Sequence, residues 1–331
     1  MNTVCYRVNA SSPEDYIIDE ATSLIRRGEL VAFPTETVYG LGADALNPEA
    51  VKKIFVAKGR MPDNPLIVHV SRKEQVEDLV EDLPSEAQLL MQKFWPGPLT
   101  LVARAAPQVP EAVRGGGDSV GVRMPRHPVA LALIDRAGPL AAPSANLSGR
   151  PSPTTGEHVR QDLWGRIAAI LDAGPTGLGI ESTVLRVMEK PFRILRPGGV
   201  SREELEQLVP GMVEPGAGAA PADKYQHYRT RAELIIIPEK AEVVSLVRDY
   251  RAKSKRIGIA IHNPSKYTHI MGKIDRMFVM EADAQAAGRE LYTVLRDADR
   301  EGLDVLLFEP YGDTGAGAAI MDRLRKASQK D

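Results

Sequence analysis

A group of hydroxyl, carboxyl and phenol side chains directly follows an apolar run near the N-terminus. The run "LVAF", residues 30–33, has the character of a short buried strand, and "PTETVYGLG" comes immediately after it. A chain leaving a sheet has little packing reason to place two hydroxyls, of Thr35 and Thr37, and the phenol of Tyr39 in its first turn. These side chains need another explanation, and the glycines of the turn would let main chain pass close to a ligand.

Two cations in "KGRMPDNP", residues 58–65, could neutralise a polyphosphate. Lys58 and Arg60 flank Gly59 just after a predicted helix, and Asn64 leads into a strand. Cations on a Gly-bent loop can converge on phosphate. An ordinary helix end explains the same residues, because a lysine complements the helix dipole and a glycine caps the C-terminus. The sequence has no GxxxxGK[ST] motif and no dinucleotide fingerprint, so any nucleotide would be bound by a different kind of loop.

Polar residues also follow other predicted strands. "APSANLSGRPSPT", residues 142–154, is stiffened by prolines and could present its hydroxyls and amide to a ligand, or be an ordinary surface turn. Arg123 could bind the carboxylate of a ligand or form a structural salt bridge with another residue. His69, inside "LIVHV", fits a satisfied core histidine better than a ligand. Without a Cys/His cluster or a GxSxG motif, the sequence argues against a zinc site and an α/β-hydrolase nucleophile.

The elements that would position these residues alternate between helices and strands. Hydrophobic periodicity and capping residues predict helices over 14–29, 47–59, 85–95, 127–138, 201–209, 241–253, 283–299 and 315–327. Short apolar runs predict strands at 30–33, 66–70, 99–103, 119–123, 138–142, 166–171, 182–187, 192–195, 234–237, 256–261, 277–280 and 304–308. This order indicates an α/β or α+β architecture before residue 213 and an α/β architecture after the linker.

The character of the sequence changes near residue 213. Residues 213–232 lack apolar periodicity and are rich in Gly, Ala and Pro, which is typical of a linker. We expect domains at 1–212 and 233–331, the second with a Rossmann-like parallel sheet. Tyr225, His227 and Tyr228 crowd the linker, and a plain spacer does not need aromatic rings. They would form an active-site lid or dock the two domains.

Bulk composition is that of an ordinary globular protein. The 331 residues are 43% hydrophobic and 26% charged, with a net charge of −2, so a basic nucleic-acid coat is not expected. Cys5 is the single cysteine, which suits a reducing compartment. The sequence shows no signal peptide and no apolar run of membrane-spanning length, so we expect a cytoplasmic protein without membrane contact.

Taken in order, the motifs resemble the threonylcarbamoyl-AMP synthase family with its YrdC-like fold, in the long two-domain form. The resemblance covers nearly the whole chain and rests on "FPTETVYGLGADA", "KGRMPDNPLIVHV", "FWPGPLTLV", "VGVRMPRHP", "PLAAPSANLSGRPSPT", "ILDAGPTGLGIESTV" and "LRPGGV". It implies a twisted mixed-sheet catalytic domain followed by a smaller Rossmann-like domain.

The resemblance implies an enzyme, a nucleotidyltransferase, that turns L-threonine, bicarbonate and ATP into threonylcarbamoyl-AMP and pyrophosphate. Mg²⁺ would be coordinated by the ATP phosphates and would take no ligand from the protein. The adenylate would pass to tRNA threonylcarbamoyl transferase machinery. The alternatives are an RNA-binding module of the same fold, which the charge balance disfavours, and a carbamoyl-transfer domain of hydrogenase-maturation type, which lacks support because the zinc-finger and acylphosphatase-like segments are missing.

The family's roles carry over to individual residues. Lys58 and Arg60 resemble its catalytic pair. The resemblance assigns ATP contacts to Arg60, Asn64, Ser119, Ser144, Asn146, Ser152, Arg196 and Tyr228. It assigns the threonine pocket to Thr37, His69, Arg123, Ala142 and Ser182, with Arg123 suited to the substrate carboxylate. It also implies that the turn "PTETVYGLG" lines the cleft, with Thr35 and Tyr39 shaping its wall.

The sequence departs from the family pattern at two places. Met61 stands where the family often has Pro. In the linker, the family's "SPGMKxxHYAP" is replaced by "APADKYQHYRT", which keeps Pro221, Lys224, His227 and Tyr228. The second departure falls in the segment that would form the lid.

Overall fold

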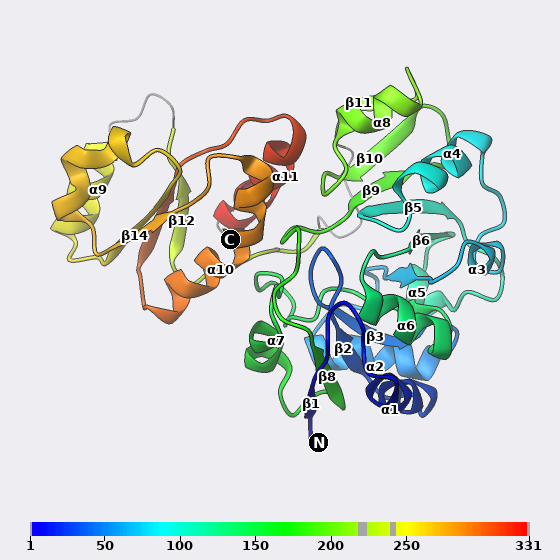
Figure 1. The fold of residues 1–331 in the computed structure, drawn as a ribbon. Coiled ribbons are helices and arrows are strands. Elements are labelled where there is room, and N and C mark those ends of the chain that lie inside the picture. Colours follow the sequence, from blue (N-terminus) through cyan, green and yellow to red (C-terminus); the bar gives the residue numbers. More distant parts are fainter. Residues whose placement is uncertain (1, 218–223, 239–242, 330–331) are drawn as a thin grey trace. The chain divides into compact units, whose positions relative to one another are not determined.

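The chain folds as two units in a computed structural model, which describes residues 2–217, 224–238 and 243–329 (Figure 1). Unit 1 comprises Met1–Ser148 and Ser152–Lys224, and unit 2 comprises Gly149–Pro151 and Tyr225–Asp331. The linker residues Ala220, Pro221, Ala222 and Asp223 lie outside the described residues.

Unit 1 is built on one mixed sheet of 11 strands, in the order β1-β8-β2-β3-β7-β4-β6-β5-β9-β10-β11. Its strands are β1 Val4–Arg7, β2 Val31–Phe33, β3 Gly40–Asp44, β4 Ile67–His69, β5 Leu99–Arg104, β6 Ser119–Arg123, β7 Leu140–Ala141, β8 Ala169–Asp172, β9 Thr183–Arg186, β10 Phe192–Arg196 and β11 Val213–Ala217. Parallel pairs such as β4–β6 and antiparallel pairs such as β5–β6 occur in the same sheet. The predicted mixed-sheet α/β fold is confirmed.

Helices cover this sheet, and side-chain alternation separates two apolar clusters. The helices are α1 Asp15–Arg26, α2 Pro48–Lys58, α3 Glu74–Glu77, α4 Ser85–Phe94, α5 Glu111–Arg114, α6 Pro128–Ala137, α7 Gly156–Leu163 and α8 Arg202–Leu208. Val31 and Phe33 of β2 pack into a cluster with α1 and α6, whereas Ala32 packs into the cluster that contains α2. Successive strand residues point to opposite faces, so one apolar strand serves both clusters.

Helix α2 shows how local signals fix a helix that leads into the site. Asn47 accepts hydrogen bonds from the N–H groups of Glu49 and Ala50, and Pro48 occupies the first turn. Gly59 ends the helix in the left-handed conformation, with φ of 62°. The predicted caps are confirmed, and they place Lys58 in the last helical turn.

Strand β3 was not predicted, because three of the five residues in its sequence "GLGAD" are glycine or acid. The strand pairs antiparallel with β2, with Gly40 opposite Phe33 and Gly42 opposite Val31. A Cβ on Gly42 would lie 2.8 Å from the Phe33 ring, so glycine makes room for that ring across the pair. The sequence also gave no sign of α3, α5, α7 or β11. The last of these places residues 213–217, the start of the predicted linker, in the sheet beside β10.

Tyr39 joins two neighbouring loops of unit 1 from within the core. The side chain is 0% exposed, which is not compatible with the expected position on a cleft wall. Its hydroxyl donates to the carbonyl of Gly174 at 2.6 Å and accepts the N–H of Ala173 at 3.2 Å. Burial and the nearby Asp172 carboxylate raise the pKa of the phenol, so it remains a donor. Tyr39 is therefore a structural tie.

Unit 2 is a parallel four-stranded sheet in the order β12-β15-β13-β14. Its elements are β12 Glu233–Ile236, α9 Val243–Ala252, β13 Ile257–Ile261, the 3₁₀ segment η2 Pro264–Lys273, β14 Arg276–Val279, α10 Ala284–Arg300, β15 Val305–Phe308 and α11 Gly315–Ser328. Apolar residues of α9 and η2 pack with Ile257 and Ile259 of β13. The predicted Rossmann-like parallel sheet is confirmed.

We expect Tyr39→Phe to lower the free energy of unfolding of unit 1 by about 1–3 kcal/mol, because a buried carbonyl and a buried N–H lose their partner. Both tryptophans, Trp95 and Trp164, lie in unit 1, so their fluorescence during urea unfolding reports on this unit. Tyr16→Phe is the matched control, since Tyr16 is 68% exposed. Equal stabilities of the two variants would refute the structural tie.

Candidate active site

The turn after β2 is organised by one hydroxyl. The Thr35 hydroxyl donates to the carbonyl of Val38 at 2.6 Å and accepts the N–H groups of Thr37 and Val38 at 3.1 and 3.2 Å. It also lies 2.8 Å from the Thr37 hydroxyl. Both threonines are buried. This local network fixes the Thr37 side chain in one direction.

Arg123, at the end of β6, is a buried cation against which several loops converge. Its Nε donates to the carbonyl of Gly97 at 3.1 Å, and its Nη1 donates to the Thr37 hydroxyl at 3.0 Å. Its Nη2 lies 2.8 Å from Oε1 of Glu36 in an ion pair. Of the two interpretations considered for this arginine, the salt bridge is thus present. The direct bond to Thr37 brings two predicted threonine contacts together.

His69 lies directly opposite Arg123 in the parallel register of β4 and β6. The imidazole is buried, and its Nδ1 has no hydrogen-bond partner within the part of the chain that the structure describes. Burial, together with the positive charge of Arg123, lowers the pKa of His69 to about 3. The ring is therefore neutral at physiological pH, and Nδ1 remains available for a ligand that enters beside Arg123.

Ser182 and Arg196 meet across β9 and β10. Arg196 Nη2 donates to the Ser182 carbonyl at 2.9 Å and to its hydroxyl at 3.3 Å. The Ser182 hydroxyl also lies 2.8 Å from the Thr100 hydroxyl. A Cβ on Gly198 would lie 2.3 Å from the Ser182 main chain, so only glycine lets the "RPGG" loop approach this closely. Nearby in sequence, Glu181 accepts a hydrogen bond from the Ser152 hydroxyl at 2.5 Å.

Lys58 ties α2 to the proline-rich loop after β7. Its ammonium donates to the carbonyls of Ser144 and Asn146, both at 2.5 Å. Lys58 is only 3% exposed, so its ammonium is buried and does not lie near solvent as a loop cation ordinarily would. Burial, and secondarily the charge of Arg60, lowers its pKa well below the usual lysine value. The side chain thus fixes the loop that carries two predicted ATP contacts.

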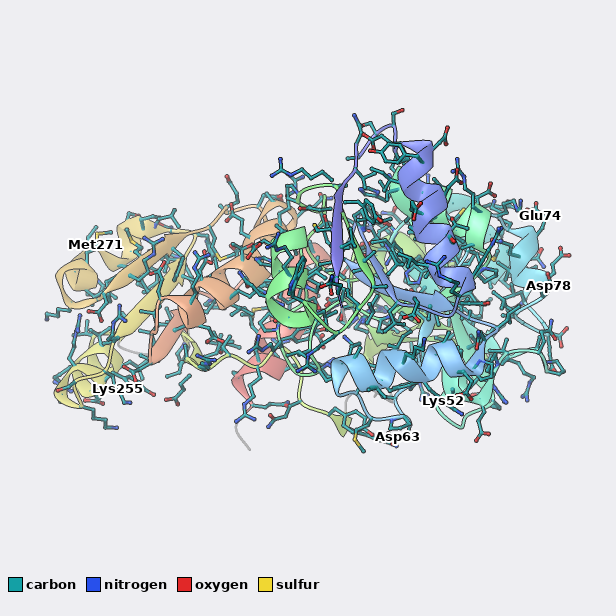
Figure 2. All side chains as sticks on the ribbon, turned by 90° about the horizontal axis from the view of Figure 1, so that it is seen from below. Lys52, Asp63, Glu74, Asp78, Lys255 and Met271 are labelled. Atoms are coloured by element: carbon teal, nitrogen blue, oxygen red, sulfur yellow. The ribbon has the colours of Figure 1, made fainter. Side chains whose placement is uncertain are left out.

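Arg60 and Asn64 form a second pair on the loop after α2. Arg60 Nη2 donates to Asn64 Oδ1 at 2.5 Å and to the Pro65 carbonyl at 2.9 Å. Asp63, within this loop, and Lys52, in the preceding α2, are exposed and lie on the outside of unit 1 (Figure 2). Arg60 itself is partly buried.

The remaining predicted contacts are more dispersed. Ala142 donates its N–H to the Ile67 carbonyl at 2.9 Å, which places it beside β4, the strand that contains both Ile67 and His69. Ser119 begins β6 and is separated from Arg123 by the length of that strand, roughly 13 Å at the usual rise per residue. Tyr228 belongs to unit 2, where its ring stacks on Tyr292 at 5.4 Å. The roles of Ser119 and Tyr228 at the nucleotide stay predictions.

Sequence reasoning missed three residues that shape these contacts: Glu36, Gly97 and Gly198. Glu36 stood in the opening motif, where an acid between two buried threonines was a usable signal. Gly97 acts through its carbonyl, and a Cβ there would lie 2.3 Å from the Phe94 carbonyl. The sequence itself does not show such close main-chain approaches.

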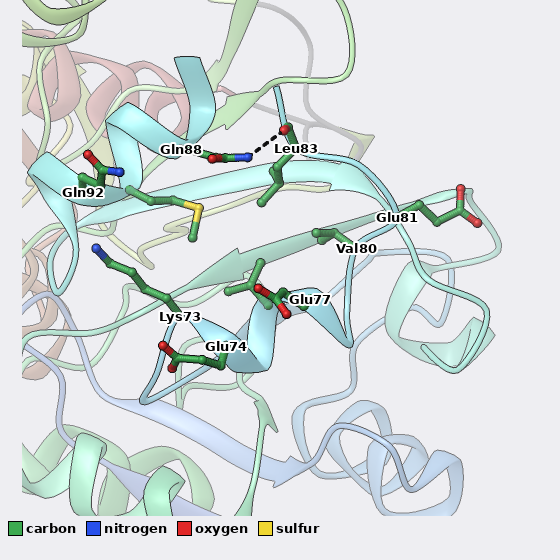
Figure 3. A pocket seen from close by; sticks show the side chains of 10 residues that line it. Lys73, Glu74, Glu77, Val80, Glu81, Leu83, Gln88 and Gln92 are labelled. Carbon is green, nitrogen blue, oxygen red and sulfur yellow. Dashed lines mark hydrogen bonds between the residues drawn. The ribbon is translucent and has the colours of Figure 1, made fainter. Parts of the chain in front are cut away.

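A separate pocket of about 400 Å³ lies between α3 and α4 (Figure 3). Lys73, Glu77, Met91 and Gln92 are among its lining residues, and none of the predicted site residues lines it. Over the described ranges, no three His, Cys, Asp or Glu side chains gather closely enough to hold a metal ion. Among the described helices, none combines the length and apolar character needed to cross a lipid bilayer.

Two protein-family models match consecutive parts of the chain. A family model described as "Telomere recombination" (Sua5_yciO_yrdC) matches residues 23–198, and one described as "Threonylcarbamoyl-AMP synthase, C-terminal domain" matches residues 200–329. The threonylcarbamoyl-AMP synthase of Pyrococcus abyssi is 44% identical over 329 residues, covering 95% of each chain. That of Bacillus subtilis is 44% identical over 327 residues, covering 96% of this chain and 94% of the relative.

The structural comparison agrees with the sequence matches. The crystal structure of P. abyssi Sua5 complexed with L-threonine superposes with a TM-score of 0.88 at 43% identity, covering 99% of this chain and 97% of that chain.

The lowered pKa of His69 predicts acid sensitivity of unit 1. Between pH 6.5 and 3 the unfolded chain binds a proton at this residue that the folded chain does not, so stability falls as the pH falls. One proton corresponds to a slope of about 1.4 kcal/mol per pH unit. We expect His69→Gln to flatten the stability profile by that amount, measured by urea unfolding between pH 4.5 and 6. Parallel profiles would mean that His69 is protonated in the folded state.

Proposed function

The chain belongs to the threonylcarbamoyl-AMP synthase family and is an ATP-using enzyme with that family's activity, and we propose that unit 1 joins L-threonine, bicarbonate and ATP into threonylcarbamoyl-AMP and pyrophosphate. The contact between Arg123 and Thr37, with His69 in register beside it, carries this proposal. It supplies a buried cation, a hydroxyl and a neutral imidazole, which suit the carboxylate and hydroxyl of threonine.

The chemistry requires positioning and charge neutralisation. Bicarbonate takes up a proton and loses water to give carbon dioxide, and the threonine amine adds to it with release of a proton to form a carbamate. A carbamate oxygen then attacks the α-phosphorus of ATP, and pyrophosphate leaves. In such a reaction at phosphorus, the protein positions the reacting groups and stabilises charge but forms no covalent bond to them. Arg60 and Arg196 would hold phosphate charge, and Asn64, Ser144, Asn146 and Ser152 would complete the nucleotide site. Mg²⁺ would bind the phosphates and draw no ligand from the protein.

The structure gives Lys58 a particular place in this proposal. Its ammonium is already bonded to the carbonyls of Ser144 and Asn146, so it would act on ATP by holding the loop that binds the nucleotide. Arg60, which is only partly buried, remains the better candidate for direct phosphate contact. The adenylate would then pass to the tRNA threonylcarbamoyl transferase machinery, in a cytoplasmic setting.

Pyrophosphate release tests the proposal. We expect release to require threonine, bicarbonate and ATP together, with each omitted in turn. Arg60→Ala should lower kcat and kcat/KM by roughly 100-fold, because a preorganised charge that acts on the transition state is lost. Arg104→Ala, an exposed arginine on β5, is the control. Release without threonine or bicarbonate, accompanied by tight RNA binding with a steep salt dependence, would favour the RNA-binding alternative.

The lid function of residues 213–232 stays a prediction that ligand can test. A segment that closes over bound substrates excludes water from a labile adenylate and becomes less accessible. We expect ATP plus L-threonine to slow limited tryptic cleavage after the exposed Lys224. The control is cleavage after Lys52, which is exposed on α2. Equal cleavage rates at Lys224 with and without ligands would contradict a lid.

A further inference from the structure

Glu36 and Arg123 form an almost fully buried ion pair in the predicted threonine pocket. Their side chains are 12% and 5% exposed, and Glu36 Oε1 lies 2.8 Å from Arg123 Nη2. Neither of these two atoms has a hydrogen-bond partner among the residues that the structure describes, so the contact joins the charges without directing an N–H at an oxygen. Buried polar atoms normally have hydrogen-bond partners. Two adjacent atoms that both lack a hydrogen bond therefore indicate a position where a ligand can supply it.

The other polar atoms of both residues are used to hold them. Glu36 Oε2 accepts the main-chain N–H of Arg126 at 2.9 Å, and the Glu36 carbonyl accepts the N–H of Leu178 at 2.7 Å. Arg123 is held by Gly97 and Thr37. The pair is thus fixed from several loops, and its unused atoms face each other.

Two imidazoles complete the electrostatics around the pair. His69, opposite Arg123, is neutral because burial and the arginine charge lower its pKa to about 3. His127, one residue after Arg126, has its pKa lowered by burial, an effect that the Glu36 charge partly offsets. A neutral His69 therefore adds no positive charge beside the Glu36–Arg123 ion pair.

We propose that Glu36 makes this pocket selective for a zwitterion, pairing with the substrate ammonium while Arg123 Nη2 binds the substrate carboxylate. This inference rests on the proposed function. An α-amino acid carries both charged groups on one carbon, which matches two opposite charges 2.8 Å apart. Arg123 alone would accept any small carboxylate. With Glu36 beside it, a carboxylate that lacks an ammonium leaves Glu36 without a new partner and adds like-charge repulsion in a poorly solvated site.

Binding measurements without ATP test this selectivity apart from catalysis. Isothermal titration calorimetry of the full chain would compare L-threonine with 3-hydroxybutyrate, which lacks the amine. We expect wild type to bind threonine at least tenfold more tightly. In Glu36→Gln, which keeps the shape and an acceptor for Arg126, threonine affinity should fall at least tenfold while 3-hydroxybutyrate affinity stays equal or rises. The preference between the two ligands is therefore lost.

Two control variants separate selectivity from damage to the pocket. Glu29→Gln removes a carboxylate that pairs with Lys53 elsewhere in unit 1, and it should leave both affinities unchanged. Glu36→Asp keeps the charge and should keep the preference for threonine. An equal loss of both ligands in Glu36→Gln, or an unchanged preference, would overturn the role of Glu36 alone. Absence of threonine binding by wild type would overturn the proposed function and this inference together.

Discussion

Burial of the Arg123 charge is the constraint from which much of the site follows. A guanidinium taken out of water is costly unless charge and hydrogen bonds compensate it. The structure compensates it from three directions, with the Gly97 carbonyl, the Thr37 hydroxyl and the Glu36 carboxylate. This requirement answers why a turn leaving a buried strand contains two hydroxyls and an acid. Thr35 holds Thr37, Thr37 binds Arg123, and Glu36 balances the charge.

A second buried cation shapes the other half of the site by a different route. Lys58 has main-chain carbonyls as partners, so its effect is to order the loop of Ser144 and Asn146. The same loop is joined to β3, because Leu41 donates its N–H to the Pro143 carbonyl and Ala145 donates to the Tyr39 carbonyl. The helix-end interpretation of Lys58 and Gly59 and the functional interpretation are therefore both compatible with this structure, since the cap directs the lysine toward the loop.

The sequence predicted the elements whose signals are local. Asn47, Pro48 and Gly59 define α2 within a dozen residues, and the apolar run "LVAF" is enough to predict β2. Strand β3 escaped prediction because its glycines serve the ring of Phe33, a residue of another strand. The order of the family motifs predicted most of the candidate site. Gly97 and Gly198 escaped because a carbonyl acceptor or a missing Cβ acquires meaning only when distant segments meet, whereas Glu36 stood in the opening motif and was overlooked.

The candidate site fixes its charges before any substrate arrives. Arg60 is bonded to Asn64 and the Pro65 carbonyl, Arg196 to Ser182, and Arg123 to Gly97 and Thr37. These bonds orient each guanidinium before an anion arrives. A reaction at phosphorus that needs no protein nucleophile depends on this kind of preorganisation, because dipoles and charges already in place do not have to reorganise in the transition state. The free energy needed to orient these charges is thus supplied when the chain folds, through hydrogen bonds to main-chain acceptors in the loops.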